Sequence, residues 1–365
     1  MHSRTRPLYW QVADDIATKI ASGEWPAGHK LPSERELCSV HGVSQITVRR
    51  ALRELEHPKR VYSQHGVGWF VASEALVEEA RCVALLVPAL GWPMAELVRL
   101  LANELAERNV GLRVALTEGD SNQERRAMAQ VVGNGADALL WVAAGPQPAL
   151  RARYDALLAQ TDLPQLMLWR SVPEIDLPSM VLDEQACMEQ LTRHVLSLGH
   201  SRVAYAGTSP AQPDGRDRYW GFVSALWEHG LELPLDWVFA ERLDGEPEAQ
   251  RLRATFQGDR GPTALVCDSD LVAAEAMRVL CSAGLHCPQH VAIVGLGDRD
   301  FCPYLPTPLT TLRFDLEPLA HAAALAALDL MAGRHVASAR FGGRMAVRES
   351  CGADVAGQGA DLLRS

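Results

Sequence analysis

Short apolar segments alternate with longer amphipathic segments from residue 82 to about residue 295, and this alternation limits the possible folds more than any other feature of the chain. Helical spacing of apolar residues is clearest in the amphipathic stretch 94–109. Such alternation is typical of parallel sheets covered by helices. Because the pattern restarts near Arg202, we predict two α/β lobes that bind a ligand between the carboxyl ends of their strands. The expected strands are Cys82–Val87, Leu112–Leu116, Asp137–Val142, Gln165–Trp169, Arg202–Gly207, Ala264–Cys267 and Val291–Gly295.

Length and composition indicate a soluble globular protein with more than one domain. The 365 residues exceed one compact core, so two or three domains are expected. No apolar run approaches the ~20 residues that span a bilayer, and the segment MHSRTRPLYW at the start lacks the apolar stretch of a secretory signal. The eight cysteines form no C-x-x-C pair and most lie in apolar segments, which favours buried reduced thiols over a metal site. We therefore expect a cytoplasmic protein with no membrane partner and no metal.

The lysines exclude several classes of enzyme. All three, Lys19, Lys30 and Lys59, precede Arg60 in the sequence. Residues 73–365 thus offer no amine for a Schiff base and no P-loop lysine, which argues against pyridoxal-phosphate and P-loop chemistry. The G-x-S-x-G sequence of serine hydrolases and the H-E-x-x-H sequence of zinc proteases are also absent. We expect a binding protein without a cofactor and not an enzyme.

Charge separates the segment 1–72 from the rest of the chain. Residues 1–72 carry ten basic and seven acidic side chains, a net charge of +3. Since the whole chain carries −10, residues 73–365 carry −13. This asymmetry suggests that only the N-terminal segment approaches an anionic polymer such as DNA, although an ordinary solvated surface is an alternative interpretation.

The same N-terminal segment has the pattern of a helix-turn-helix. Apolar residues recur every four positions from Leu8 to Ile20, which predicts an amphipathic helix. Ser33 and Glu36 form a capping box for a second helix, and Ser44 caps a third. Two short helices joined by a glycine-containing turn form this motif. Two short strands, residues 61–63 and 69–71, follow and predict a β-hairpin wing around residues 65–68.

The string GEWPAGHKLPSERELCSVHGVSQITVRRALREL, followed by QHGVGWFV, resembles the winged helix-turn-helix of the GntR family of bacterial regulators. The resemblance covers most of the segment 1–72 and implies that the third helix enters the major groove while the wing tip touches the minor groove. The DNA contacts that it implies come from Arg35, Ser44, Gln45, Thr47, Arg49, His65 and Gly66. This chain departs from the family at Lys59-Arg60 and in the wing, where GVG replaces a commonly arginine-centred tip.

The chemistry of these side chains agrees with DNA recognition. The guanidinium of Arg49 can grip a guanine edge with two hydrogen bonds, and the amide of Gln45 can read adenine or a phosphate. Hydroxyls and backbone amides usually set the register on phosphates. A surface ion pair is the alternative for Arg35, and purely structural roles are the alternative for Arg50 and Arg53.

Residues 82–351 resemble the periplasmic-binding-protein-like effector domain of LacI/GalR regulators. The segments that carry the resemblance are HVLSLGHSRVAYAG, RYWGF, PTALVCDSD, VAIVGLGD, LPTPLTTLRFD and VRESC. It implies that the chain crosses between the lobes near Asp183, near Arg313 and after Gly333. The expected domains are a winged helix-turn-helix at 1–72, a linker at 73–81 and an effector domain at 82–355, with lobe 1 at about 82–182 and 314–333 and lobe 2 at about 184–312.

The same resemblance implies effector contacts from both lobes. The residues are Arg218, Asp270, Asp298, Arg170, Asp183, Trp92 and Trp220. A guanidinium in a cleft can fork onto hydroxyls or a carboxylate, and indole faces stack on sugar rings or purines. Core packing is the alternative for either tryptophan, and a surface charge is the alternative for Arg218. Gly297 and Ser269 stand where the family has Asp and Asn, which removes polar contacts that often hold sugar hydroxyls.

These features together predict a transcription regulator, most simply a repressor. Two chains would form a homodimer and present two recognition helices to a palindromic operator in double-stranded DNA. A small-molecule effector, expected to be a sugar or sugar derivative, would change DNA affinity by binding one arrangement of the lobes better than the other. A regulatory head on an enzyme is opposed by the lysine distribution. A regulator that senses a protein partner or a non-sugar metabolite through a diverged cleft is the other alternative.

Overall fold

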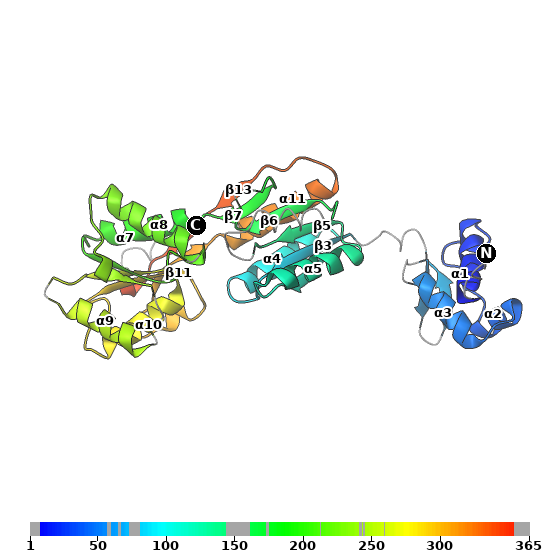
Figure 1. Ribbon diagram of the computed structural model, residues 1–365, viewed down its shortest axis with the longest axis horizontal. Coiled ribbons are helices and arrows are strands. Elements are labelled where there is room, and N and C mark those ends of the chain that lie inside the picture. Colours follow the sequence, from blue (N-terminus) through cyan, green and yellow to red (C-terminus); the bar gives the residue numbers. More distant parts are fainter. Residues whose placement is uncertain are drawn as a thin grey trace, which may run out of the picture. The chain divides into compact units, whose positions relative to one another are not determined.

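The chain divides into two compact units, a head (Met1–Arg81) and a body (Cys82–Ser365), whose elements are labelled in Figure 1. The computed structural model describes residues 8–56, 60–64, 67–72, 81–143, 161–172, 175–211, 213–240, 243, 245–258 and 260–353. The predicted fold class, a winged helix-turn-helix followed by a two-lobed parallel α/β domain, is confirmed.

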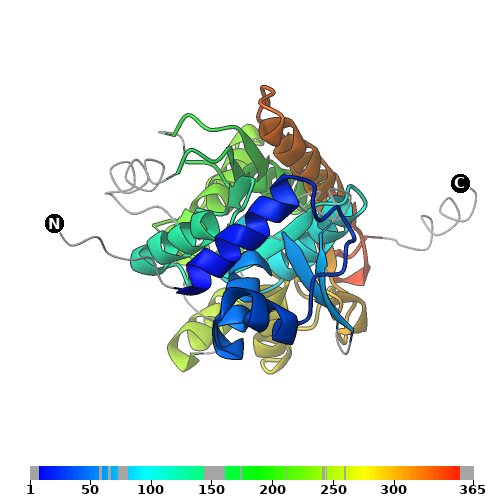
Figure 2. The same cartoon turned by 90° about the vertical axis from the view of Figure 1, so that its right-hand side faces the viewer.

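The described part of the head contains the helices α1 (Leu8–Ala21), α2 (Glu34–His41) and α3 (Gln45–Glu56). Ser33 Oγ accepts a hydrogen bond from Glu36 N (3.3 Å), and Ser33 N donates to Glu36 Oε2 (2.7 Å), so the predicted capping box is confirmed. Gly42 ends α2 with φ +62°, a left-handed conformation that favours glycine. In Figure 2, α1 is the dark blue helix beside the two shorter helices of the head, and it packs on α3.

A hairpin completes the described part of the head. β1 (Val61–Gln64) and β2 (Gly68–Val71) are antiparallel and pair Val61 with Val71. Ile16, Val48 and Leu52 are fully buried against the hairpin and one another, so α1, α3 and the wing share one core. Lys59, His65 and Gly66 lie outside the described residues, so their predicted roles are not addressed by this structure.

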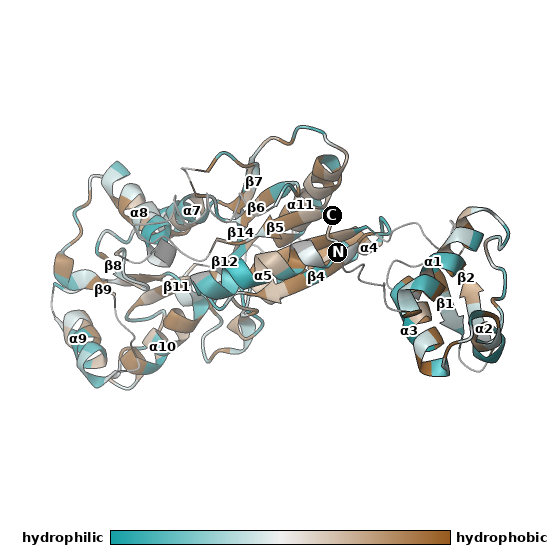
Figure 3. Ribbon diagram, turned by 45° about the vertical axis from the view of Figure 1, so that its right-hand side comes forward, coloured by the Kyte–Doolittle hydropathy of each residue, from teal (hydrophilic) through white to brown (hydrophobic). Residues whose placement is uncertain are grey.

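Lobe 1 of the body is a six-stranded parallel sheet in the order β13-β7-β6-β5-β3-β4. Alternate residues of β3 point to opposite faces of the sheet. One set packs in the apolar cluster that includes α4 and α11, and the other set packs in the cluster that includes α5, so these helices cover opposite faces. These strands appear mostly brown in Figure 3, as expected for a sheet buried on both faces. The elements are β3 (Cys82–Val87), α4 (Met94–Ala106), β4 (Gly111–Leu116), α5 (Ser121–Gly133), β5 (Ala138–Trp141), β6 (Gln165–Trp169), β7 (Ser179–Leu182), α11 (Leu316–Met331) and β13 (Ala339–Phe341).

Lobe 2 is a second six-stranded sheet in the order β14-β12-β11-β10-β8-β9, parallel except for the edge strand β14. Helices α7 and α8 cover one face, and α9 and α10 cover the other. The elements are α7 (Glu184–Ser197), β8 (Val203–Ala206), α8 (Pro213–Glu228), η1 (Leu235–Trp237), β9 (Val238–Phe239), α9 (Glu246–Gln257), β10 (Ala264–Cys267), α10 (Asp270–Cys281), β11 (Ala292–Gly297), η2 (Cys302–Tyr304), β12 (Thr310–Phe314), β14 (Gly343–Ala346) and η3 (Glu349–Cys351).

The described chain crosses between the two sheets at Asp183, Asp315 and Gly342. Asp183 N donates to Phe341 O (2.8 Å) and Asp315 N donates to Gly342 O (3.1 Å), so the crossing segments are hydrogen-bonded to one another. The third crossing lies later than the expected end of lobe 1 at residue 333, because β13 pairs with β7 in the first sheet before the chain leaves it.

Two adjacent glycines at the third crossing differ in the space around them. A Cβ on Gly343 would overlap the carbonyl oxygen of Arg313 and the side chain of Leu312, whereas a Cβ on Gly342 would meet nothing within 4 Å. We therefore expect Gly343→Ala to lower the free energy of unfolding by about 1–3 kcal/mol, since β14 must move away from β12. Gly342→Ala is the matched control and should change it by less than about 0.5 kcal/mol. Urea denaturation measures the free energy of unfolding of both variants, and equal effects would contradict this account of the third crossing.

The cysteines are less uniformly buried than the sequence suggested. Cys187, Cys267, Cys302 and Cys351 are buried, but Cys281, the last residue of α10, is exposed. Within the described ranges, no group of three or more His, Cys, Asp or Glu is arranged to hold a metal ion. None of the helices described is both long enough and apolar enough to cross a membrane.

Candidate functional site

The exposed face of α3 carries the polar side chains that were predicted to read DNA. Gln45 and Arg49 are exposed one helical turn apart, so their side chains lie on the same face. Ser44 Oγ accepts a hydrogen bond from Thr47 N (3.3 Å), and the two hydroxyls are 2.9 Å apart, so Ser44 caps the helix. Ile46 between them is 81% exposed, which leaves an apolar contact available on the same surface.

Glu34, which the sequence did not single out, organises this face. Its carboxylate accepts from Gln45 Nε2 (2.7 Å) and from Arg49 Nε (2.8 Å to Oε2). Arg49 uses only Nε for these bonds and its side chain stays 58% exposed, so its terminal nitrogens are available to a base edge. Glu34 of α2 therefore fixes the direction of the two side chains of α3 that were predicted to read bases.

The other arginines of the motif differ in their surroundings. Arg50 lies over the ring of Tyr9, with 4.0 Å between the guanidinium carbon and the ring centroid, and so ties α3 to α1. This contact supports the structural alternative for Arg50. Arg35 and Arg53 are exposed and make no ion pair with any described residue, which leaves Arg35 able to contact phosphate.

In the body, Trp92 joins the two lobes. It follows β3 of lobe 1, yet its ring stacks on Phe314 of lobe 2 with 6.5 Å between centroids. The guanidinium of Arg299 lies 5.1 Å from the centroid of the same ring. A Cβ on Gly297 would lie 2.5 Å from the indole, so glycine is needed while Trp92 occupies this position. Trp92 is thus an interlobe contact, and its predicted stacking on a ligand stays a prediction.

Trp169, which the sequence did not single out, lies at the same junction. It is the last residue of β6, its ring meets Phe314 edge-on at 5.9 Å, and it is 5% exposed. Its φ of +73° is rare for a bulky residue and is the kind of strain found at functional sites. Arg170 follows directly and is half-buried, so this backbone conformation determines where the predicted effector contact points.

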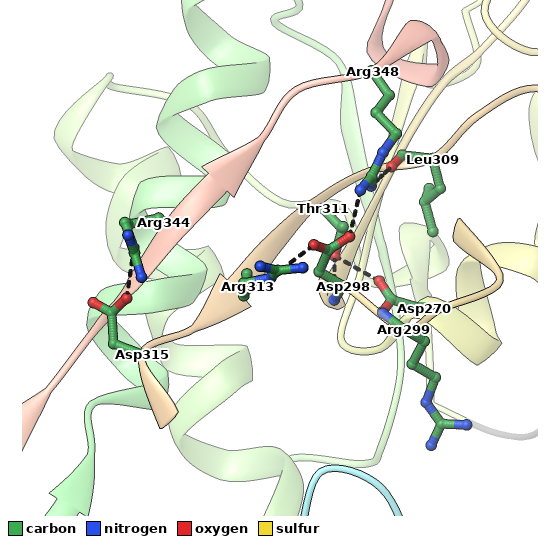
Figure 4. A network of polar contacts seen from close by, with 9 residues as sticks. All are labelled: Asp270, Asp298, Arg299, Leu309, Thr311, Arg313, Asp315, Arg344 and Arg348. Atoms are coloured by element: carbon green, nitrogen blue, oxygen red, sulfur yellow. Dashed lines mark hydrogen bonds and ion pairs between the residues drawn. The ribbon is translucent and has the colours of Figure 1, made fainter. Parts of the chain in front are cut away.

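Asp298 is held by two arginines at the end of β11. Its Oδ2 accepts from Arg313 Nε (3.0 Å) and its Oδ1 accepts from Arg348 Nη2 (2.7 Å), as Figure 4 shows. The side chain is only 4% exposed. The predicted effector contact is therefore already neutralised by protein charges in this arrangement of the lobes.

Asp270 is buried at the start of α10 and joins that helix to the neighbouring strands. Its carboxylate accepts from Thr311 Oγ1 (2.6 Å) and from Arg299 N (2.8 Å), and no part of the residue is exposed. Burial raises the pKa of Asp270, although these hydrogen bonds oppose the rise. Through Arg299 N, Asp270 supports the loop that follows β11. A direct contact between Asp270 and an effector stays a prediction.

Arg218 lies on α8 and is paired with Glu184 at the start of α7. Arg218 Nη2 donates to Glu184 Oε1 (2.8 Å), Nε donates to Oε2 (3.1 Å), and Nη1 donates to Asp268 O (3.3 Å). Burial, the largest single effect, lowers the pKa of Arg218, but the charge and hydrogen bonds of Glu184 and the charge of Asp268 together raise it more, so the pKa lies above its ordinary value. The buried carboxylate of Asp268 accepts from Thr208 N (2.6 Å) beside this pair.

The remaining predicted contacts lie on either side of this arginine. Asp183 caps α7 by accepting from Ala186 N (3.0 Å), and its other oxygen is 3.6 Å from Arg340 Nη1. Trp220 is 53% exposed on α8, with Tyr219 as its ring neighbour at 5.8 Å. The structure thus brings Asp183 and Arg218 to the start of α7, and Trp92, Asp270 and Asp298 to the end of β11.

Comparison with known proteins agrees with this two-part organisation. Residues 8–71 match the model of the bacterial regulatory proteins of the gntR family, and residues 192–351 match that of a periplasmic binding protein-like domain. The arabinose metabolism transcriptional repressor of Geobacillus stearothermophilus is 27% identical over 327 residues, which cover 86% of this chain and 88% of the relative. The transcriptional repressor CytR of Escherichia coli is 24% identical over 265 residues, 71% of this chain and 75% of the relative.

Solved structures agree with the fold of the body. The structure of the lac repressor dimer bound to operator and the anti-inducer ONPF superposes with a TM-score of 0.64 at 17% identity, covering 76% of this chain and 96% of that one. At this level of identity the likeness concerns the fold alone. The chain joins a gntR-family helix-turn-helix domain to a periplasmic-binding-protein-like domain.

Proposed function

We propose that the protein is a transcription repressor whose affinity for an operator is controlled by a small molecule bound in the body. The observation that carries the proposal is the face of α3, where Gln45 and Arg49 are exposed side by side and oriented by Glu34. The relatives that span most of the chain are transcriptional repressors by name, which supports the same function. Such a regulator works in the cytoplasm, where its DNA is.

The operator would be palindromic double-stranded DNA bound by a homodimer. One α3 can read only a few base pairs, and a two-fold pair of heads doubles the recognised sequence. Arg49 and Gln45 would contact base edges, while Arg35, Ser44 and Thr47 would contact phosphates. His65 and Gly66 are proposed for the minor groove on the family resemblance.

The effector would act through the junction between the lobes. The proposed contacts come from both lobes. Lobe 1 and its border would contribute Trp92, Arg170 and Asp183, and lobe 2 would contribute Arg218, Trp220, Asp270 and Asp298. Each of the crossings at Asp183, Asp315 and Gly342 is a single residue between two elements, and the three together would act as a hinge. A ligand that binds one lobe arrangement better than the other would shift operator affinity by that difference and no more.

A carbohydrate is the proposed class of effector, and a non-sugar metabolite or a protein partner is the alternative. Two positions favour the alternative. The indole of Trp92 fills the space that a side chain at Gly297 would need, and the Oγ of Ser269 caps α10, so neither position offers a free polar group to a sugar. Both positions therefore serve packing in this chain.

The test has two stages. Duplexes selected from a random library by the full-length protein should yield a palindrome, and a band-shift titration should show saturable binding to it. A panel of sugars, sugar acids, sugar phosphates and nucleosides should then contain a compound that raises the unfolding temperature, as expected for a ligand of the native state, and that changes binding to the palindrome. Failure to enrich any sequence would contradict the DNA-binding function. Enrichment without any effective compound would favour the alternative of a protein partner.

A further inference from the structure

Two exposed arginines lie directly opposite each other where the chain passes between the lobes. Arg313 of β12 pairs in register with Arg344 of β14. Side chains opposite each other in an antiparallel pair have Cβ atoms about 4.5–5.5 Å apart, and like charges in this position repel. The side chains are 60% and 71% exposed, so solvent and a ligand can reach both.

Each guanidinium is held by one aspartate and keeps most of its donors open. Arg313 Nε donates to Asp298 Oδ2 (3.0 Å), and Arg344 Nε donates to Asp315 Oδ1 (2.8 Å). Figure 4 shows each arginine pointing to its own aspartate. Among the described residues, neither arginine uses its terminal nitrogens in a hydrogen bond. A pair of terminal N–H groups is the fork that matches a carboxylate or a phosphate.

The acceptors around the arginines are already in use. Asp298 also accepts from Arg348 Nη2 (2.7 Å) and is nearly buried, and Asp270 is fully buried between Thr311 and Arg299 N. The network of Figure 4 contains four arginines and three aspartates, and one of these aspartates, Asp270, has no contact with solvent. What it offers to a ligand is therefore hydrogen-bond donors and positive charge, and a ligand rich in acceptors would complement it.

We propose that Arg313 and Arg344 bind the anionic group of the effector, a carboxylate or a phosphate. The inference rests on the proposed function in taking the anion to be part of an effector. β12 ends just before the crossing at Asp315, and β14 begins just after the crossing at Gly342. An anion bridging the two arginines would remove their mutual repulsion and tie these strands together at the hinge. A neutral sugar lacks the group that this pair would bind.

The test uses the full-length protein and inorganic anions, so it requires neither the operator nor the identity of the effector. The unfolding temperature is measured while phosphate, or in a second arm acetate, replaces chloride at constant ionic strength. We expect a saturable rise with at least one of the two oxyanions. Arg313→Gln and Arg344→Gln should each shift the half-saturating concentration upward at least tenfold.

Arg334→Gln is the matched control, because Arg334 is 63% exposed and is also held by a single aspartate, Asp329. It removes the same charge and should leave the half-saturating concentration unchanged. The proposal is overturned if neither oxyanion gives a saturable rise, if the two hinge variants respond like the wild type, or if Arg334→Gln weakens binding as much as they do. Because no DNA is present, such a failure leaves the selection of an operator by the head as a separate result.

Discussion

Arg49→Ala is expected to weaken operator binding by roughly 5- to 150-fold per half-site, the effect of about 1–3 kcal/mol for a lost bidentate base contact. The structure gives the reason. Glu34 holds Arg49 through Nε, and the terminal nitrogens stay exposed on the face of α3. The loss should be accompanied by relaxed preference for guanine at one position of each half-site. Fluorescence anisotropy at moderate salt with the selected palindrome measures the affinity, and single-base variants of the palindrome measure the preference.

Arg53→Ala provides the control for charge. Arg53 lies on the same helix, is exposed, and makes no ion pair with a described residue, so the substitution removes one positive charge from the same surface. Its effect should be smaller and uniform across base variants, as for a lost phosphate interaction. Equal losses in the two variants, with an unchanged guanine preference in Arg49→Ala, would show that Arg49 does not read a base.

The local structure of the head could be predicted because short-range chemistry determines it. The capping box at Ser33 and the turn at Gly42 depend on residues within a few positions of each other, and both are present. The direction of Arg49 could not be predicted in the same way. It depends on Glu34, which is distant in sequence, and no periodicity links the two positions.

Some strands of the body could likewise be predicted from the sequence, and others could not. β3, β6 and β10 have the bounds expected from their continuous apolar runs. β7 and β12 were not predicted as separate strands. Each begins with serine or threonine, and their burial comes from neighbours that are distant in sequence. β13 was missed for a similar reason, since only pairing with β7 places its three residues in lobe 1.

The candidate site in the body shows where resemblance is least informative. It pointed to Asp270 and Asp298, yet both carboxylates are bound by neighbouring side chains and backbone in this structure. It did not point to Trp169, whose unusual φ angle is a property of the backbone and not of the residue sequence. The glycine at position 297 was visible as a departure from the family. Its meaning, space for Trp92, required the contact between the lobes.

Glu184→Ala should be among the most destabilising single substitutions in the body, with a loss of about 3 kcal/mol in the free energy of unfolding. Glu184 and Arg218 are 11% and 19% exposed, so removal of the carboxylate leaves a largely buried guanidinium without its counter-charge. Glu189→Ala is the matched control on the same helix. Glu189 pairs with Arg193, which is 43% exposed and also bound to Glu228, so its loss should cost less than about 1 kcal/mol. Urea denaturation of the two variants gives the comparison.

A double variant separates lost charge pairing from lost packing. Replacing the arginine as well, in Glu184→Ala/Arg218→Met, removes the unpaired charge and fills part of its volume with an apolar side chain. If the unpaired charge is the cause, the double variant should be more stable than Glu184→Ala alone. If it is less stable, the guanidinium stabilises the junction of α7 and α8 through Asp268 O without needing Glu184. The pair would then be a site where an effector's carboxylate or hydroxyls could replace Glu184 at little cost to the fold.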